Sequence, residues 1–339
     1  MDYTTDVAII GAGPSGLFMV FECGFLGYKA AVLDALPHLG GQLAALYPEK
    51  PIYDIPGHPK VLAGDLVKNL EQQAAPFAPT YLLGEPVDGL EGTPGAFTLK
   101  TASHSIHAKV VVIAGGGGMF VPRKPVGVEN LERFEQNKNV VYAIRNKAAL
   151  EGKTVVIAGG GDSAVDWAVE LAETCAHVHV VHRRPDFRAA EETVRQMMEL
   201  AESGKITIHT PYQLKALHGD DALREVVVAD MDGTEKVLSA SHVVCCFGLA
   251  PNPGPFAKWG LSSEGDGVER GQLAVHRPTM QTSQQGILAI GDIAGYAGKV
   301  SLILTGFAEA AVAAKQVQAL INPEKKFKVQ YSTSKGVPA

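Results

Sequence analysis

The stretch VVIAGGGDSAVDWAVELAETCAHVHVVHRRPDFRA, residues 155–189, has the pattern of a strand, a glycine turn, a helix and a second strand, followed by a cluster of arginines. Its apolar run 155–158 is short and uninterrupted, which is typical of a strand buried on both faces of a parallel sheet. Gly159, Gly161 and Ala164 follow in G-x-G-x-x-A spacing. In such a motif the first glycine forms a tight turn, the second lets the backbone approach a pyrophosphate, and the small third residue lets helix pack on strand. The stretch therefore predicts a dinucleotide-binding turn.

A helix is expected over about 163–175, because Asp162 and Ser163 are good helix starters whose N–H groups would face the phosphates. Beyond the next expected strand, 177–181, the carboxylate that usually binds a free ribose 2′-OH is missing. Basic side chains follow that strand instead: His182, Arg183, Arg184 and Arg188. Because arginines at this place suit a 2′-phosphate, we predict that the unit binds NADPH; solvated surface charge is the alternative.

A second unit of the same kind opens the chain. Gly11, Gly13 and Gly16 follow a short apolar run, and adding 148 to their numbers gives 159, 161 and 164. Asp34 takes the place that His182 has in the later unit (34 + 148 = 182). Two copies in one register predict two dinucleotide sites, the first for a nucleotide with free ribose hydroxyls, FAD or NAD.

Length and composition exclude several classes of protein. A chain of 339 residues, 46% hydrophobic with 37 glycines, suffices for two domains with large cores. The net charge of −6 gives a nucleic-acid partner no electrostatic support. The four cysteines show no C-x-x-C and no metal spacing, and glycines interrupt the apolar N-terminal run. We therefore expect a reduced, cytoplasmic protein with no metal site, signal peptide or membrane span.

The segment after Asp34 is rich in glycine and proline, so we expect an ordered loop, not a helix, over 39–57. Gln42 and Tyr47 in that segment lie within reach of a ligand at the first site. An amide and an aromatic ring are suitable partners for the isoalloxazine ring of a flavin. A helix is expected next, over about 63–74.

Short β-like runs separated by turn residues predict a small antiparallel meander: 80–83, 97–101 and 105–108. A buried strand is expected at 109–114, and the glycines at 115–118 mark a domain boundary. Past the second dinucleotide unit the pattern of the first domain returns, with a strand at 287–290 and an alanine-rich helix at 304–320.

Three further expected strands close the second unit: 207–209, 225–230 and 242–247. The first domain is therefore discontinuous. We predict an FAD-binding domain over 1–119 and 249–339, with an NADP(H)-binding domain over 120–248 inserted into it. The expected fold class is α/β: two Rossmann-like dinucleotide-binding domains, three-layered around parallel sheets, plus the small antiparallel meander.

Over essentially its whole length the sequence resembles the two-dinucleotide flavoprotein disulfide reductases, and within them the thioredoxin-reductase-like branch. The markers are the two glycine fingerprints, Gly40-Gly41-Gln42, the run 182–189, Gly248-x-x-Pro251-Asn252 and Gly291-Asp292. The resemblance implies that Asp292 contacts the ribityl chain of FAD. It also implies that the helix after Asp292 points its N-terminus at the flavin, where it favours negative charge on the reduced ring.

One departure from that branch bears on the reaction. Thioredoxin reductases carry a redox-active C-x-x-C just upstream of the second glycine motif, but 140–147 contains no cysteine, and neither does 40–47. Cys245 and Cys246 are adjacent in an expected strand, where their side chains would point to opposite faces, which disfavours a working dithiol. Electrons must then leave a reduced flavin directly, and flavins can release them singly.

This combination resembles the thioredoxin-reductase-like ferredoxin–NADP⁺ reductases, as do the octet 161–168 and the turn Tyr47-Pro48-Glu49. The resemblance implies hydride exchange between NADPH and FAD, one-electron transfer between FAD and ferredoxin or flavodoxin, and a homodimer. It also implies a set of FAD contacts: Gly11, Gly13, Ser15, Gly16, Asp34, Gln42, Tyr47, Val87, Phe120, Asp292 and Thr333.

The tail from Lys325 onward continues past the point where thioredoxin reductases stop. The relatives suggest a tail that folds over the flavin, with an aromatic ring on the face opposite Tyr47. Tyr331 is the aromatic at the right distance before Thr333. A frayed polar terminus is the alternative.

Because ferredoxins and flavodoxins are acidic, we expect a local basic surface for docking on this acidic chain. The candidates are Arg123, Lys124, Arg145, Lys147, Lys325, Lys326 and Lys328. Other interpretations remain: a thioredoxin-type reductase with another dithiol, a reductase of quinones or small acceptors, and a non-catalytic flavin-binding protein.

Overall fold

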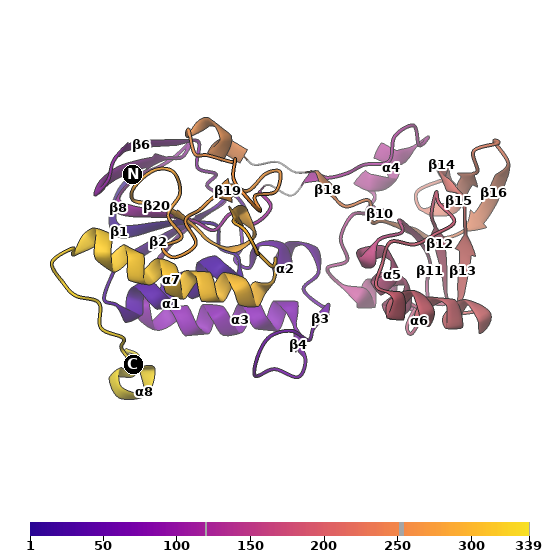
Figure 1. The fold of residues 1–339 in the computed structure, drawn as a ribbon. Helices are drawn as coiled ribbons and strands as arrows, with labels where there is room; N and C mark the ends of the chain where they lie inside the picture. The colour runs from indigo at the N-terminus through magenta and orange to yellow at the C-terminus, as the bar shows by residue number, and fades with distance from the viewer. Residues whose placement is uncertain (119–120, 251–253, 339) are drawn as a thin grey trace. The chain divides into compact units, whose positions relative to one another are not determined.

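The computed structural model describes residues 1–118, 121–250 and 254–338, and the chain forms two compact units (Figure 1). Unit 1 comprises Met1–Val121 and Pro251–Ala339, and unit 2 comprises Pro122–Ala250. The chain passes between the units twice, and the two connections pair as the short strands β9 (Val121–Pro122) and β18 (Leu249–Ala250). The assignment of FAD to unit 1 and of NADP(H) to unit 2 stays a prediction.

Unit 1 is built on a seven-stranded sheet with the order β5-β2-β1-β8-β7-β6, and β20 also pairs with β8. The strands are β1 (Asp2–Ile10), β2 (Ala30–Asp34), β5 (Thr80–Leu83), β6 (Gly89–Thr93), β7 (Ala96–Lys100), β8 (Ser105–Ile113) and β20 (Ile287–Ala289). β5, β2, β1, β8 and β20 pair in parallel, and β7 pairs antiparallel with β6 on one side and with the first part of β8 on the other. Parallel strands buried on both faces explain the uninterrupted apolar runs.

The predicted meander is partly wrong. The run 80–83 is β5, which pairs in parallel with β2 and belongs to the main sheet. The runs 105–108 and 109–114 belong to the single strand β8, which ends at Ile113 and is continuous because it pairs along its whole length with β1. Its first part also pairs with β7, and its end pairs with β20. The third meander strand is β6, which has no strand pattern in the sequence because GLEGT is a glycine-containing, largely exposed run.

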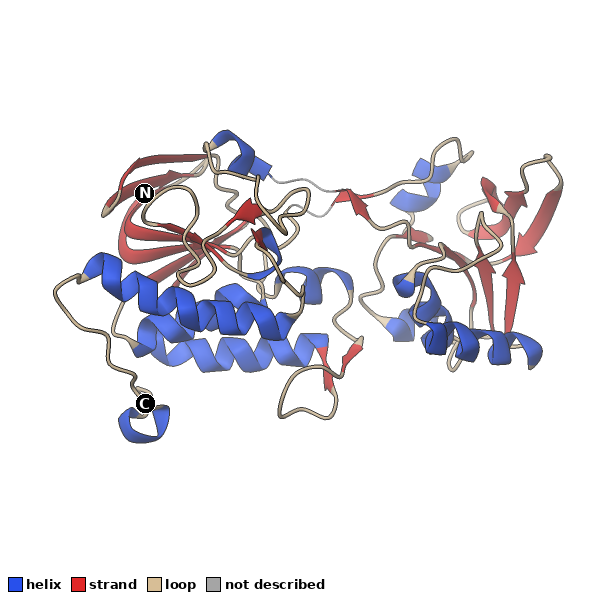
Figure 2. Ribbon diagram, in the orientation of Figure 1, coloured by secondary structure: helices blue, strands red, loops and turns tan. Residues whose placement is uncertain are grey.

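Helices α1 (Pro14–Phe25), α3 (Ala63–Ala74) and α7 (Ile303–Ile321) lie side by side along the sheet, as Figure 2 shows. The expectation of a helix-free loop over 39–57 is wrong, because Gly41–Leu46 forms α2. Gly40 takes a left-handed backbone with φ 102°, which lets the chain turn sharply into that helix. The smaller elements of unit 1 are β3 (Pro51–Ile52), β4 (Val61–Leu62), η1 (Ala75–Phe77), η3 (Gly254–Lys258), β19 (Leu273–Ala274), η4 (Gly291–Ile293), β21 (Ala294–Gly295) and α8 (Ser332–Lys335).

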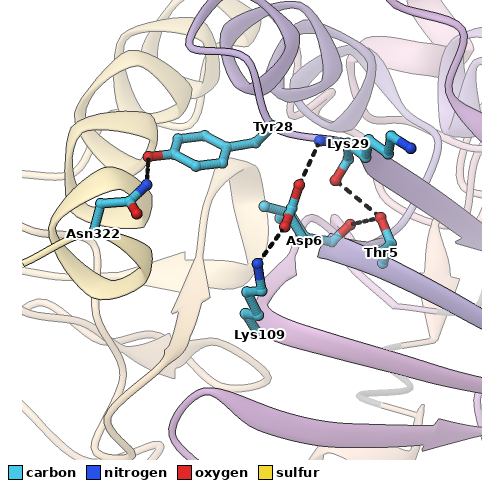
Figure 3. Close-up of polar contacts among 7 residues, drawn as sticks. Thr5, Asp6, Tyr28, Lys29, Lys109 and Asn322 are labelled. Carbon is cyan, nitrogen blue, oxygen red and sulfur yellow. Dashed lines mark hydrogen bonds and ion pairs between the residues drawn. The ribbon is translucent and has the colours of Figure 1, made fainter.

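Polar contacts tie the elements together near the start of β1 (Figure 3). The Asp6 carboxylate accepts hydrogen bonds from the backbone N–H of Lys29 (3.0 Å) and from the Lys109 ammonium (2.8 Å), joining β1 to the chain before β2 and to β8. Asn322, just past α7, donates to the Tyr28 hydroxyl at 2.8 Å. The opposite, carboxyl end of the parallel strands is where ligands bind in sheets of this kind.

Unit 2 has a five-stranded parallel sheet with the order β10-β17-β11-β12-β13 and an antiparallel sheet β14-β15-β16. The parallel strands are β10 (Val140–Val141), β11 (Thr154–Ala158), β12 (His177–Val181), β13 (Ile206–His209) and β17 (His242–Cys245). The antiparallel strands are β14 (Gln213–Gly219), β15 (Leu223–Ala229) and β16 (Glu235–Ser239). The helices are α4 (Leu131–Gln136), η2 (Lys147–Leu150), α5 (Asp162–Leu171) and α6 (Glu191–Glu202).

The expected α/β class with parallel sheets is confirmed. Within unit 2, α5 ends at Leu171 and not at 175, and α6, β14 and β16 were not expected. In the described ranges no helix combines the length and apolarity that crossing a membrane requires.

Candidate functional site

The first glycine turn connects β1 to α1 and is shaped by close backbone contacts. Gly11 has φ 110°, and a Cβ there would lie 2.3 Å from the Ala114 carbonyl oxygen. A Cβ on Gly16 would lie 1.9 Å from the Gly11 carbonyl oxygen. By contrast, a Cβ on Gly13 would have no protein atom within 4 Å. Two of the glycines are therefore required by the fold, while the third borders open space, as expected where a ligand approaches the backbone.

Asp34 ends β2 beside this turn. Its carboxylate accepts hydrogen bonds from the backbone N–H of Ala12 (2.6 Å) and of Leu36 (2.8 Å). Burial raises the pKa of Asp34, and the two N–H donors oppose that rise. The Asp34 carbonyl accepts from the N–H of Glu85 at 2.9 Å, which holds the loop leading to the buried Val87 against the end of β2. The acid and Val87 thus lie on neighbouring segments, as a contact to the adenosine half of a dinucleotide requires.

Helix α2 begins at the same turn. The N–H of Gly40 donates to the Ala12 carbonyl at 2.8 Å, and a Cβ on Gly41 would lie 3.0 Å from the Cα of Gly13. Gln42, in the first turn of α2, has its Nε2 within 3.6 Å of where a Cβ on Gly117 would be. The Gln42 amide therefore lies by the glycine segment 115–118 that follows β8.

Tyr47 caps the C-terminus of α2 and is near the charge of Asp292 in η4. Burial raises the pKa of Tyr47, and the negative charges of Asp292 and Asp54 raise it further. Ser15 Oγ also lies near η4, 2.9 Å from where a Cβ on Gly291 would be and 2.1 Å from where one on Gly306 would be. Ser15, η4 and the first turn of α7 thus meet at the start of α1, so the N-termini of α1, α2 and α7 gather around one location.

The C-terminal tail lies away from the N-termini of α1, α2 and α7. Tyr331 is 68% exposed, and α8 lies at the C-terminal end of α1, where the Lys335 ammonium donates to the Phe25 carbonyl and lies 4.8 Å from the centroid of its ring. Helix α1 has 12 residues and is about 18 Å long. Tyr331 and Thr333 therefore stand at the end of α1 remote from Tyr47, and their flavin contacts stay predictions. Phe120 lies outside the described residues.

The second glycine turn, between β11 and α5, repeats the geometry of the first. Gly159 has φ 153°, and a Cβ there would lie 2.4 Å from the Cys246 carbonyl oxygen and 3.1 Å from the Cβ of Ala164. A Cβ on Gly161 would meet only the Arg188 carbonyl oxygen, at 3.7 Å. Gly159 and Ala164 are thus needed for packing, and Gly161 borders open space.

The segment after β12 folds back onto this turn. The Arg188 N–H donates to the Gly160 carbonyl at 2.7 Å, and the Asp162 carboxylate accepts from the Ala190 N–H at 2.9 Å. This pairing holds the predicted basic residues close to the N-terminus of α5, whose exposed first turn includes Asp162 and Ser163.

The three predicted arginines, Arg183, Arg184 and Arg188, are exposed, and none forms an ion pair or side-chain hydrogen bond with another residue in the described ranges. His182 differs from them. Its ring packs on Gly160, where a Cβ would lie 2.4 Å from it, and stacks on Phe187 at 5.4 Å between centroids. Burial lowers the pKa of His182, and the neighbouring arginine charges lower it further. The guanidinium groups are therefore available for an anionic ligand, and the imidazole supports the turn.

The four cysteines form no disulfide bond. Cys23, Cys175 and Cys245 are buried, Cys246 is partly buried, and all four are free of disulfide bonds. Burial raises the pKa of Cys23, Cys175 and Cys245, which keeps these thiols protonated and unreactive. No group of three or more potential metal ligands occurs in the part of the chain that the structure describes.

A buried polar cluster that the sequence did not predict lies behind η4 and is formed by Tyr296, Lys299 and Glu309. The Glu309 carboxylate accepts hydrogen bonds from the Tyr296 hydroxyl (2.6 Å), the Gly291 N–H (2.7 Å) and the Lys299 ammonium. A signal was present: Glu309 is the one charged residue within 306–314 of the alanine-rich helix expected over 304–320.

Comparison with known proteins identifies the family. Residues 5–316 match the family described as pyridine nucleotide-disulphide oxidoreductase. The chain belongs to this family. Proteins named ferredoxin–NADP reductase from Acidiphilium cryptum (strain JF-5) and Anaplasma phagocytophilum (strain HZ) are 51% and 46% identical to it. The first alignment covers 99% of this chain and 98% of the relative, and the second covers 100% and 99%. The expected resemblance is therefore confirmed.

Solved structures of thioredoxin reductases share the fold. A thioredoxin reductase from T. acidophilum aligns with a TM-score of 0.76 at 24% identity, covering 93% of this chain and 98% of the other. A thioredoxin reductase from Lactococcus lactis aligns with a TM-score of 0.75 at 22% identity, covering 94% and 99%. The expected fold, two Rossmann-like domains of the thioredoxin-reductase type, is thereby confirmed.

Proposed function

We propose that this chain is an FAD-dependent ferredoxin–NADP⁺ reductase, with FAD at the first glycine turn and NADP(H) at the second. The observation that carries the proposal is the contrast between two turns of equal geometry. The first unit ends in the carboxylate of Asp34, and the second ends in three exposed arginines whose side chains form no hydrogen bond or ion pair in the described ranges. The relatives named ferredoxin–NADP reductase, about half identical over the whole chain, support the reaction and the acceptor.

The residues at the first turn fit a flavin dinucleotide. The open space at Gly13 and the N-terminus of α1 suit a pyrophosphate. Asp34 would accept hydrogen bonds from the ribose hydroxyls, with Val87 beside the adenine. At the other end, Gln42 would contact the ring, Tyr47 would stack on it, and Asp292 would accept from the ribityl hydroxyls. Ser15 completes the proposed contacts at this turn, and Thr333 and Phe120 remain proposed on the resemblance alone.

The residues at the second turn fit NADP(H). Gly161 borders the open space for the pyrophosphate, and the N–H groups of Asp162 and Ser163 begin α5 there. Arg183, Arg184 and Arg188 supply positive charge for a 2′-phosphate, for which arginine forks are well suited. An NAD site would present a carboxylate in their place.

Electron delivery does not require a dithiol in this proposal. When bound, a flavin accepts two electrons as hydride and passes them on singly. The chain's own part is to hold the donor and the ring, through the arginines on one unit and through Tyr47, Gln42 and Asp292 on the other. Since the chain lacks C-x-x-C and three of its thiols are buried, a thioredoxin-type relay is not favoured.

The acceptor would be ferredoxin, and flavodoxin is its chemical equivalent as an acidic one-electron carrier. Of the candidate docking residues, Lys124 pairs with Glu135 (2.7 Å) and Lys147 with Glu170, so their charges are partly neutralised. Arg123, Lys325, Lys326 and Lys328 are exposed and remain the better candidates; Arg145 is retained as well. A cytoplasmic homodimer completes the proposal.

Anaerobic stopped flow tests this function. NADPH should bleach the absorbance of the bound flavin, and mixing the reduced protein with ferredoxin should restore it as ferredoxin is reduced. Thioredoxin should leave the reduced protein unchanged. Failure of NADPH to bleach the flavin refutes an NADPH oxidoreductase, and rapid oxidation by thioredoxin but not by ferredoxin or flavodoxin refutes the proposed acceptor.

A further inference from the structure

A buried ion pair lies directly behind the turn that carries Asp292. The side chains of Lys299 and Glu309 are only 5% and 4% exposed. Glu309 accepts from the Gly291 N–H at 2.7 Å, and the Lys299 ammonium donates to the Gly291 carbonyl at 3.0 Å while also contacting Glu309. Both backbone polar groups of Gly291 are therefore held by charged side chains, which form the stronger class of hydrogen bond.

Stability alone does not explain the ion pair between Lys299 and Glu309. The free energy needed to take two charges out of water is about as large as the attraction between them. Proteins in which apolar residues replace a buried ion pair are often no less stable. The neighbouring core positions of α7 are small and apolar, such as Ala310 and Ala313. A charge at position 309 is therefore best explained by the geometry that it imposes on Gly291.

That geometry is demanding. Gly291 has φ 72°, and a Cβ there would lie 2.9 Å from Ser15 Oγ at the start of α1. Glu309 belongs to α7, whose Gly306 meets the same Ser15 oxygen. The pair thus locks η4 between the N-termini of α1 and α7, and any shift of Gly291 would move the next residue, Asp292.

Asp292 is held by its backbone and left open at its side chain. Its carbonyl accepts from Gln272 Nε2 at 3.1 Å. Its carboxylate is exposed, and in the described ranges no protein donor hydrogen-bonds to it. A carboxylate with a fixed backbone and free acceptor capacity is preorganised for hydroxyl groups of a ligand.

We infer that Lys299 and Glu309 are positioning residues that fix Asp292 for the polyhydroxylated chain of the flavin through the two hydrogen bonds to Gly291. The Tyr296 hydroxyl completes the arrangement by donating to Glu309 at 2.6 Å. The inference rests on the proposed function, because it assigns the hydroxyl ligand to FAD.

The test uses the double variant Lys299→Met/Glu309→Gln, which removes both charges and leaves no unpaired buried ion. Its folded fraction is measured by circular dichroism, and its FAD dissociation constant by fluorescence titration of the flavin-free protein. We expect FAD binding to weaken about tenfold to a hundredfold, the loss of one hydrogen bond to a charged group expressed as an equilibrium constant. The KM for NADPH should stay within about twofold, because none of these residues belongs to unit 2.

A double-mutant cycle separates positioning from a general structural role. Combined with Asp292→Asn, the double variant should cost little further FAD affinity, because Asp292 is the group through which the pair acts. Gln318→Met is the matched control: Gln318 is equally buried on α7 but donates to the Lys325 carbonyl and not to η4. It should leave the FAD dissociation constant unchanged.

The outcomes are distinct. If the wild-type chain does not bind FAD, the proposed function fails. If it does bind FAD, and the folded double variant binds it equally well or the cycle with Asp292→Asn is additive, the positioning inference is overturned.

Discussion

Replacing Gly13 by alanine should separate ligand binding from folding. Gly13 has φ −72° and ψ −177°, a backbone that alanine adopts without strain, and its Cβ would have no protein atom within 4 Å. Alanine at a compatible glycine position typically adds about 0.4–1 kcal/mol of stability through the unfolded chain. For a unit of this size the flavin-free variant should therefore melt at the wild-type temperature or about 1–4 °C above it.

Affinity for FAD should move in the opposite direction. The new methyl group would occupy the open space that we assign to the pyrophosphate. Crowding a closely packed contact by one methyl costs about 1–3 kcal/mol, which corresponds to about fivefold to 150-fold weaker binding. The assays are a thermal melt of the flavin-free protein and a fluorescence titration with FAD.

Two matched variants sharpen this test. Gly16→Ala places a Cβ 1.9 Å from the Gly11 carbonyl oxygen, so it should destabilise the fold itself. Gly161→Ala meets only one atom, at 3.7 Å, and should raise the KM for NADPH while leaving FAD affinity unchanged. A Gly13→Ala protein that melts normally and binds FAD as tightly as wild type would refute the assignment of the pyrophosphate to this turn.

Further predictions concern charge, pH and the tail. Arg183→Ala and Arg188→Ala should each raise the KM for NADPH about tenfold or more and leave that for NADH within about twofold; equal losses for both nucleotides would contradict a 2′-phosphate site. Electron transfer to ferredoxin should slow several-fold between about 0.05 and 0.5 M salt, and a salt-independent rate would count against an electrostatic dock. Burial, together with the positive charges of nearby His177 and His209, lowers the pKa of His179 to about 4. Because the unfolded chain takes up this proton near pH 6.5, urea denaturation should show stability falling from about pH 6.5 to pH 4, by about 1 kcal/mol after screening, and His179→Gln should flatten the profile. Tyr331→Ser should change both the flavin spectrum and NADPH-linked flavin reduction; if neither changes, Tyr331 does not cover the flavin.

The features that the sequence predicts well are local ones. The two glycine turns depend on residues within one strand–turn–helix segment, so their spacing alone predicts tight turns at Gly11 and Gly159, which both have positive φ. Helix α7 likewise follows from its alanine-rich periodic run.

The structural features that the sequence does not predict depend on contacts between distant parts of the chain. The run 80–83 pairs with β2 and not with its sequence neighbours, and no local pattern distinguishes these partners. Helix α2 was missed because the glycines before it indicate a turn, and they serve both as that turn and as the helix start. Glu309 stands out in the alanine-rich sequence of α7, but its partner Lys299 lies outside that helix, so the ion pair itself appears only in the folded chain.

The pairing of β9 with β18 has a consequence for how the chain folds. Unit 1 completes its parallel sheet only when β20 docks on β8, and the whole of unit 2 lies between these strands in sequence. Loop-closure entropy grows with the length of free chain between two contacts. Once unit 2 has folded, however, its first and last strands are paired, with the Arg123 N–H donating to the Gly248 carbonyl at 3.1 Å. The free chain between β8 and β20 is then reduced to the short segments on either side of unit 2. The folded insertion therefore lowers the entropy cost of bringing the two halves of unit 1 together.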